Sequence, residues 1–174
     1  MDFFELIQAR RSIRAYKTQE VESAKLTRIL EAANRAPSAG NLQAYLILIV
    51  RDAATRQALS RASLNQESLV QAPVVLAFIA CPHSSGAKYK SRGEELYSIQ
   101  DATIACAYAQ LAATEQGLAS VWVGAFEEDA VKGILKAKPD WRPVALLPIG
   151  YPAESAGPTP RKPLDELVRD AGKR

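Results

Sequence analysis

Four short apolar runs constrain the fold of this chain more than any other feature. They are YLILIV (45–50), PVVLAFIA (73–80), SVWVGAF (120–126) and VALLPIG (144–150). Each run is shorter than an ordinary helix and rich in β-branched residues, and continuous apolar runs of this kind are typical of strands buried on both faces. The sequence therefore predicts a sheet that is covered on both sides.

Helical patterns alternate with these runs. An apolar face with a period of 3.6 residues predicts a helix from about 23 to 35, which ends before Pro37. Further helices are expected at the amino terminus, at about 53–62, 97–117 and 127–136, and briefly at LDELV near the end. Strands and helices that alternate in this way are typical of α/β or α+β proteins.

Three other segments have a distinctive composition. The helix expected over 97–117 is rich in alanine and apolar nearly all round, which predicts that it is completely buried or packs closely on another helix. The segment HSSGAKYKSRGEE (83–95) is polar and punctuated by glycine, which predicts a loop or a mobile lid. The tail after Gly150 is rich in proline and small residues. No repeat or linker divides the chain, so one domain is expected over 1–174.

Composition narrows the classes of partner. The formal net charge is only +3, and acidic residues follow the basic ones along the chain, which argues against nucleic acid. The longest apolar runs have about ten residues, whereas a membrane-spanning helix needs about twenty. Cys81 and Cys106 lie far apart in apolar runs, which argues against a disulfide framework and suits a reducing compartment. The amino terminus lacks the pattern of a signal peptide. A cytoplasmic protein that binds neither nucleic acid nor membrane is expected.

Side chains that could catalyse a reaction unaided are scarce. His83 is the single histidine and has no second ligand at metal-binding spacing, so no metal site is expected. The patterns G-x-S-x-G, G-x-G-x-x-G and G-x-x-x-x-G-K-[ST] are missing, which argues against a serine hydrolase, a Rossmann dinucleotide site and a P-loop. Any bound nucleotide must be held in another way.

The stretch QARRSIRAYK (8–17) is the clearest candidate for a binding site. Arg10, Arg11 and Arg14 surround Ser12 at the expected end of a helix. Planar guanidinium groups beside a hydroxyl suit a phosphomonoester. A solvated basic helix end, favoured by the helix dipole, is the alternative explanation of the same pattern.

Other segments add to this candidate. APSAGNLQAY (36–45) sets Pro, Ser, Gly and Asn between a helix and a strand, where a flat ligand could approach the backbone, although a simple turn would look the same. Gly124 and Ala125 end a predicted strand without bulky side chains. Arg161 and Lys162 lie in the proline-rich tail and could share a phosphate with the earlier arginines.

In this order, the segments resemble the nitroreductase family of FMN-dependent oxidoreductases. RRSIRAY resembles the family signature R-R-S-x-R-x-[FY], and APSAGNLQAY resembles A-P-S-x-x-N-x-Q-P-W. APVVLAF, the alanine-rich helix with SVWVGAF after it, LLPIGYP and Arg161 fit later blocks of the family. The resemblance therefore covers nearly the whole chain.

The resemblance implies a nitroreductase-like α+β fold with a central, mainly antiparallel sheet flanked by helices. It also implies a homodimer of intertwined chains with two FMN molecules in the interface, and a tail (about 152–174) that embraces the partner subunit. The implied cofactor site consists of Arg10, Arg11, Ser12, Arg14 and Arg161 at the phosphate and the polar edge of the ring; Pro37, Ser38, Ala39 and Asn41 of the other chain on the isoalloxazine; Asn65, or Gln66 beside it, on the flavin edge, where the local match is looser; and Gly124 and Ala125 near N5.

The chain departs from the family pattern at two places. QAY replaces the common Q-P-W, which enlarges or softens the pocket beside the ring. Ser68 stands roughly where some members have a lysine near the flavin pyrimidine, which leaves Arg14 as the candidate cation that tunes the flavin at N1 and O2. The segment 83–95 is the remaining candidate wall of the substrate pocket.

The resemblance also implies an enzyme in which FMN carries the chemistry and no side chain is itself catalytic. NADH or NADPH would pass hydride to the flavin and leave. A nitroaromatic, a quinone or a free flavin would then accept the electrons, in ping-pong order. Three alternatives stay open: a specialised member that dehalogenates a substrate or fragments reduced flavin, a flavin- or phosphate-binding module without turnover, and a nucleic-acid-binding protein.

Overall fold

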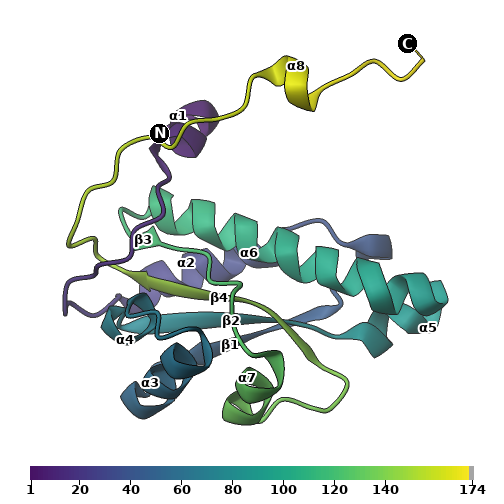
Figure 1. Ribbon diagram of the computed structural model, residues 1–174, viewed down its shortest axis with the longest axis horizontal. Coiled ribbons are helices and arrows are strands. Elements are labelled where there is room, and N and C mark those ends of the chain that lie inside the picture. Colours follow the sequence, from purple (N-terminus) through teal and green to yellow (C-terminus); the bar gives the residue numbers. More distant parts are fainter. Residues whose placement is uncertain (173–174) are drawn as a thin grey trace.

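The computed structural model describes residues 1–172 and shows a four-stranded sheet between helices (Figure 1). In chain order the elements are α1 (Phe3–Ala9), α2 (Ser23–Asn34), the short helical turn η1 (Ala39–Asn41), β1 (Tyr45–Val50), α3 (Ala53–Ala62), α4 (Ser68–Gln71), β2 (Val74–Ala80), α5 (Pro82–Arg92), the π-helical turn η2 (Gly93–Tyr97), α6 (Ser98–Glu115), β3 (Ala119–Ser120), α7 (Glu128–Leu135), β4 (Arg142–Gly150) and α8 (Leu164–Leu167). Of the expected tail, 173–174 lie outside the described residues.

The sheet is antiparallel throughout, in the order β1–β2–β4–β3. Tyr45 pairs with Ala80 at one end of β1, and Val50 pairs with Val75 at the other. Strand β2 is paired on both sides, because β4 runs along its other edge. The predicted α+β class and mainly antiparallel sheet are confirmed.

Helices cover both faces of the sheet, as the continuous apolar runs predict. Alternate side chains of β2 point to opposite faces, and all seven residues of this strand are buried. On one face they share a core with Leu26 and Ile29 of α2 and with the alanines of α6. On the other face they share a core with Leu59 of α3 and Val131 of α7. Figure 1 shows α6 on one side of the strands and α3 and α7 on the other.

Helix α6 packs on one face of the sheet beside α2. Its 18 residues correspond to about 27 Å of helix. Ala105, Ala109 and Ala113 are fully buried against α2 and the sheet, whereas Ala107 and Tyr108, on the opposite side, are exposed. The expectation that this helix packs closely on another helix is confirmed, and the alternative of complete burial within one chain is wrong.

The strand predicted over 120–126 is wrong beyond its first residue. Regular pairing with β4 is limited to Ala119 and Ser120, and a single bridge joins Val123 to Leu146. This segment lies beyond β4 at the sheet edge, where its other strand-like contact is the bridge from Ser120 to Ser12. Toward its end it carries Gly124 and Ala125, which have little side chain to bury. It therefore leaves the sheet early.

The loop or mobile lid predicted over 83–95 is also wrong, because this segment is helical as α5 and η2. Pro82 begins α5, a position that proline favours. Gly93 marks a close approach instead of a turn, because a Cβ there would lie 2.5 Å from the Ser85 carbonyl oxygen. The glycines that suggest a loop in the sequence thus include one required by tight helix packing.

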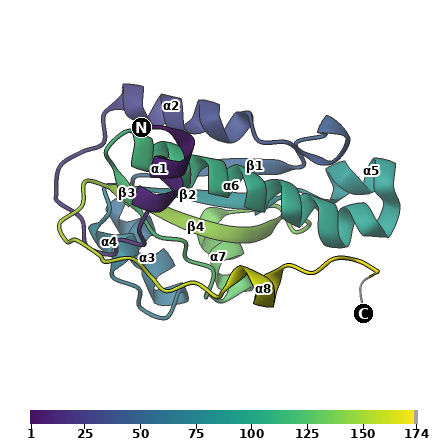
Figure 2. The ribbon, with the colours of Figure 1, turned by 90° about the horizontal axis from the view of Figure 1, so that it is seen from above.

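The tail extends away from the sheet and its covering helices (Figures 1 and 2). All residues from 153 to 172 are exposed. Helix α8 exposes Leu164 and Leu167, and α1 exposes Phe3 and Phe4. Within residues 1–172, no helix combines the length and the apolar character needed to cross a bilayer.

Candidate functional site

The arginine segment, Arg10–Arg14, follows α1 and runs along the edge of the sheet. Asp2 and Glu5 begin α1 with reciprocal hydrogen bonds between side chain and backbone, 2.8 and 2.9 Å long. The Ile13 N–H then donates to the Ser120 carbonyl at 3.1 Å, which joins the segment to β3. Because Ile13 is buried, its neighbours on either side point outward.

Tyr16 joins the arginine segment to β4 through its hydroxyl group. Its hydroxyl donates to the carbonyl oxygens of Ile13, at 2.7 Å, and Pro148, at 3.2 Å. Burial, and then the negative charge of Glu154, raise the pKa of Tyr16 well above the usual value of a phenol. The phenol therefore stays protonated and acts as a structural donor.

Replacing Tyr16 with phenylalanine is expected to lower the free energy of unfolding by about 1–3 kcal/mol at pH 7, because two carbonyls lose their donor. The folded pKa of Tyr16 lies above the unfolded value of about 10, so its stabilisation is fully present below that pH and falls as the pH rises further. Urea unfolding from pH 7 to 10.5 should show the two proteins converging at the alkaline end. Tyr108→Phe, at an exposed position, is the control. A constant gap between wild type and Tyr16→Phe would contradict this assignment.

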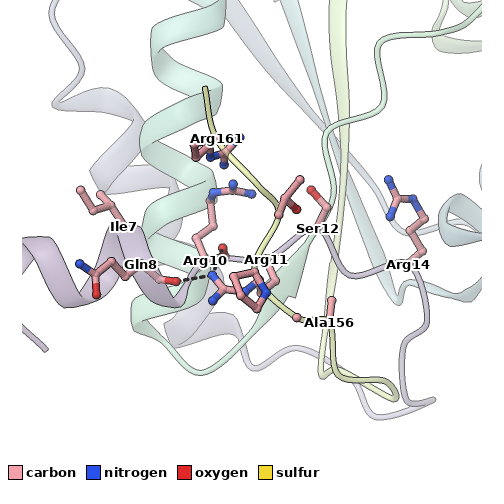
Figure 3. A pocket seen from close by; sticks show the side chains of 11 residues that line it. Ile7, Gln8, Arg10, Arg11, Ser12, Arg14, Ala156 and Arg161 are labelled. Atoms are coloured by element: carbon pink, nitrogen blue, oxygen red, sulfur yellow. Dashed lines mark hydrogen bonds between the residues drawn. The ribbon is translucent and has the colours of Figure 1, made fainter. Parts of the chain in front are cut away.

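Arg10 and Arg161 lie close together in a cavity of about 780 Å³ (Figure 3). Burial, and then the charges of Arg161 and Arg11, lower the pKa of Arg10. Among the described residues, no ion pair joins these guanidinium groups to a carboxylate. The cavity is lined by Ile7, Gln8, Arg10, Arg11, Ser12, Arg14, Ala156, Gly157, Pro158, Thr159 and Arg161. Like charges that are held together without an acid suit a multiply charged anion.

Arg11 and Arg14 line this cavity in different ways. One Arg11 nitrogen donates to the carbonyls of Gln8 and Arg10, so this side chain also caps the carboxyl end of α1. Arg14 is exposed, and Figure 3 shows it on the opposite side of Ser12 from Arg10. The arginines therefore offer two separate points of contact to an extended ligand.

Glu154 holds Arg14 in place through the backbone. One of its carboxylate oxygens accepts the N–H groups of Arg14, at 2.6 Å, and Ala15, at 3.2 Å. The Lys17 N–H donates to the Tyr151 carbonyl at 2.9 Å, just before this glutamate. These bonds tie the arginine segment to the start of the tail, which carries Arg161 to the same cavity.

The turn that contains Pro37, Ser38, Ala39 and Asn41 is held by a buried carboxylate. Asp101, in the first turn of α6, is 2% exposed and accepts the N–H groups of Ala39 at 2.9 Å and Ala44 at 3.2 Å. Between these two anchors the backbone has positive φ angles at Gly40 (56°), Asn41 (58°) and Gln43 (49°). Such conformations persist where the surroundings fix them, and they are concentrated at functional sites.

This turn borders a second cavity, of about 470 Å³. Pro37, Ser38 and Ala39 line it together with Tyr97 and residues from the start of α6. Asn41 is not among the lining residues: it is exposed, and its side-chain oxygen accepts a hydrogen bond from the Gln43 amide at 3.2 Å.

The two cavities lie toward opposite ends of α6. Asp101 holds the turn at the beginning of the helix, whereas α1 packs beside its last turns, where Leu6 and Leu111 border the same groove. Both ribbon views show α1 and α5 near opposite ends of α6. A single chain therefore does not bring its turn and its arginines to one ligand.

Besides Asn41, three predicted site residues lie outside the linings of both cavities. Gly124 and Ala125 are exposed after β3, and Asn65 is exposed in the loop between α3 and α4, with a φ of 57°. The Glu127 N–H donates to the Ala62 carbonyl at 2.8 Å, so the segments that carry these residues are neighbours. Ser120, which bonds the arginine segment, comes shortly before Gly124 and Ala125 in the sequence. Gly124, Ala125 and Asn65 therefore lie near the edge of the sheet along which the arginine segment runs.

Asp101 and Glu154 are functional candidates that motif reasoning missed. Glu154 lies outside the motifs above, and Asp101 lies in the alanine-rich helix, where the carboxylate itself was given no role. Both bond the backbone of a motif from a distant part of the sequence. Asp101 did leave a signal, because it is an acid in an otherwise apolar helix, and a buried carboxylate needs hydrogen-bond donors. Glu154 lies in a polar tail, where nothing in the sequence distinguishes it.

Comparisons with known proteins place this geometry in a family. The nitroreductase family matches the chain over residues 7–68 and 61–151. A protein of Thermus thermophilus named NADH dehydrogenase is 35% identical over 91% of this chain and 91% of its own length. An FMN reductase [NAD(P)H] of Bacillus subtilis is 33% identical over 90% of this chain and 68% of its own length.

Solved structures agree with these sequence matches. A nitroreductase family protein from Clostridium novyi superposes with a TM-score of 0.81 at 29% identity, over 95% of this chain and 91% of that protein. The family match and the relatives above 30% identity span most of the chain, including the arginine segment and the turn held by Asp101. The chain belongs to the nitroreductase family.

Proposed function

We propose that this protein is an FMN-dependent oxidoreductase that takes electrons from NADH or NADPH and passes them to a nitroaromatic, a quinone or a free flavin. The observation that carries this proposal is the pair Arg10 and Arg161, close together without a carboxylate partner in the 780 Å³ cavity. The relative named FMN reductase [NAD(P)H] supports both the cofactor and the electron donor.

The donor groups of this cavity fit the phosphate of FMN. Arg10 and Arg161 would bind the phosphate oxygens, and Arg11 and Ser12 lie beside them to contribute further donors. Arg14, on the other side of Ser12, would face the polar edge of the ring and favour negative charge there. Bound FMN would supply the redox chemistry, and the protein would bind and orient the reactants.

Other segments would hold the flavin ring. Pro37, Ser38, Ala39 and Asn41 would pack on it from the second subunit, where the strained turn offers backbone and small side chains. Gly124 and Ala125 would place a backbone N–H near N5, and Asn65 would bond the ring edge. These assignments follow the family pattern position by position.

A shared site requires two chains, so we propose a homodimer. The arginine cavity and the turn lie toward opposite ends of α6, and each chain would contribute one of them to each of two sites. The exposed apolar side chains of α1 and α8 would be covered by the partner, with the tail (about 152–174) wrapped around it. The whole chain, 1–174, would form one domain. Its two free cysteines suit the reducing cytoplasm.

Anaerobic spectroscopy tests the function. The protein purified with added FMN should show the absorption bands of bound flavin, lose them on addition of NADH or NADPH, and regain them with a quinone or a nitroaromatic. Light scattering of the same sample should give twice the mass of one chain. Protein that stays colourless after incubation with excess FMN would refute the proposal, and bound flavin that no dinucleotide reduces would favour a binding module without turnover.

A further inference from the structure

Helix α5 and the turn η2 bring an arginine to the rim of the cavity at Pro37–Ala39. Tyr97, the last residue of η2, lines this cavity. Its ring meets that of Tyr89 edge to face, with centroids 5.1 Å apart and planes at 82°. Arg92 donates from Nε to the Tyr97 hydroxyl at 2.9 Å, and its guanidinium carbon lies 5.4 Å from the ring centroid. Arg92 is thereby held beside the cavity.

Lys88 approaches the same turn directly. Its Nζ lies 5.3 Å from the centroid of the Tyr89 ring. A methyl group at Gly40 would lie 2.8 Å from Lys88 Nζ and 2.4 Å from the Tyr89 hydroxyl. Glycine at this position therefore lets the turn and α5 approach closely, and the φ of 56° also favours it. Lys88 and Arg92 together place two positive charges beside the turn.

No carboxylate neutralises these two charges within the part of the chain that the structure describes, since none of its ion pairs includes Lys88 or Arg92. Glu94 and Glu95 of η2 follow Arg92 closely in the sequence. The carboxylate of Glu94, however, lies against Gly86, where an added methyl group would be 2.4 Å from Oε1. Asp101 lines the cavity, but its oxygens accept backbone N–H groups. The charges are available to an anion.

The backbone between the two cations is strained. Lys90 has φ 55° and ψ −145°, and it interrupts α5 between the turn that carries Lys88 and the turn that carries Arg92. A conformation of this kind costs about 1–3 kcal/mol, and such conformations are concentrated at active sites and at segments that hold ligands. The kink separates a cation directed at Gly40 from one directed at Tyr97.

We propose that Lys88 and Arg92 bind a phosphate of the pyridine dinucleotide while its nicotinamide lies on the flavin. This inference rests on the proposed function, in which the turn at 37–41 packs against the ring. A dinucleotide whose nicotinamide lies there must extend its adenosine half over the neighbouring surface, and α5 adjoins the turn. The anion recognised is either the diphosphate or the 2′-phosphate of NADPH.

The test compares reductants in the flavin-loaded protein. The double variant Lys88→Gln/Arg92→Gln removes both charges and keeps side chains of similar reach. Arg51→Gln, at an exposed position after β1, is the matched control. Anaerobic stopped-flow reduction gives the dissociation constant for NADPH, for NADH and for reduced nicotinamide riboside, which carries no phosphate.

We expect the double variant to weaken NADPH binding about tenfold and to leave the binding of the riboside and the flavin content unchanged. A similar loss with NADH would identify the diphosphate as the anion, and an unchanged NADH constant would identify the 2′-phosphate. Equal changes with all three reductants, or no change with any, would overturn the inference while leaving the proposed function intact. A wild-type protein that no reductant reduces would instead refute the proposed function itself.

Discussion

Replacing Arg10 with glutamate is expected to abolish FMN retention and, at the same time, to stabilise the protein without cofactor. In the wild type, burial and the charges of Arg161 and Arg11 lower the pKa of Arg10, which means that the cation is held at a cost. A glutamate there would attract the two neighbouring guanidinium groups and repel a phosphate. Charge-assisted hydrogen bonds contribute about 1.5–3 kcal/mol each, so we expect FMN affinity to fall at least about 100-fold.

Two measurements check this result, and their opposite directions make it specific. FMN titration followed by flavin fluorescence should show weaker binding, whereas thermal unfolding of the protein without FMN should show a higher midpoint. Lys17→Glu is the control, because it makes the same charge change nearby at an exposed residue outside the cavity lining. It should leave the affinity within about twofold. Wild-type affinity in Arg10→Glu would remove Arg10 from the site.

Replacing Asp101 with alanine is expected to lower the free energy of unfolding by about 3–5 kcal/mol. The change leaves the N–H groups of Ala39 and Ala44 without their acceptor, and each lost bond is a hydrogen bond to a charged group. The turn between them also contains three residues with positive φ, which relax once their anchors are lost. Asp101→Asn keeps one acceptor oxygen and should lose about half as much. Urea unfolding measures both.

Asp52→Ala provides the matched control for this loss. Asp52 also accepts a backbone N–H, from Thr55 at 2.7 Å, but it does so at an exposed helix start. Removing such a cap typically costs about 1 kcal/mol. If Asp101→Ala were no more damaging than Asp52→Ala, Asp101 would not be the residue that holds the turn.

The sheet and most helices could be predicted because their signals are local. The runs at 73–80 and 144–150 are almost completely buried, and the run at 45–50, at the sheet edge, is mostly half-buried with Ile49 exposed. All three are continuously apolar, and the strands agree with them to within two residues. Helix α2 shows the period of a half-buried helix, and its buried side chains are those of the predicted face. In these elements, local pattern and tertiary environment agree.

The remaining features depend on contacts between distant residues. Helix α5 has a polar, glycine-containing sequence, and Gly93 is required by the approach of Ser85, which the sequence does not reveal. The strand at 120–126 fails because pairing with β4 is lost after the first positions. The carboxylates of Asp101 and Glu154 accept backbone N–H groups from segments far away in the sequence. Any residue except proline has such an N–H group, so the side chains of the donor residues do not reveal these bonds.

In the proposed dimer, the distance between the arginine cavity and the turn along α6 has a genetic consequence. In a mixed dimer of Arg10→Glu and Asp101→Ala chains, both defects would fall in the same one of the two sites. The other site would combine the intact arginines of one chain with the intact turn of its partner. Coexpression of two inactive alleles should therefore restore activity by intersubunit complementation, whereas neither allele alone, nor a chain that carries both substitutions, should do so.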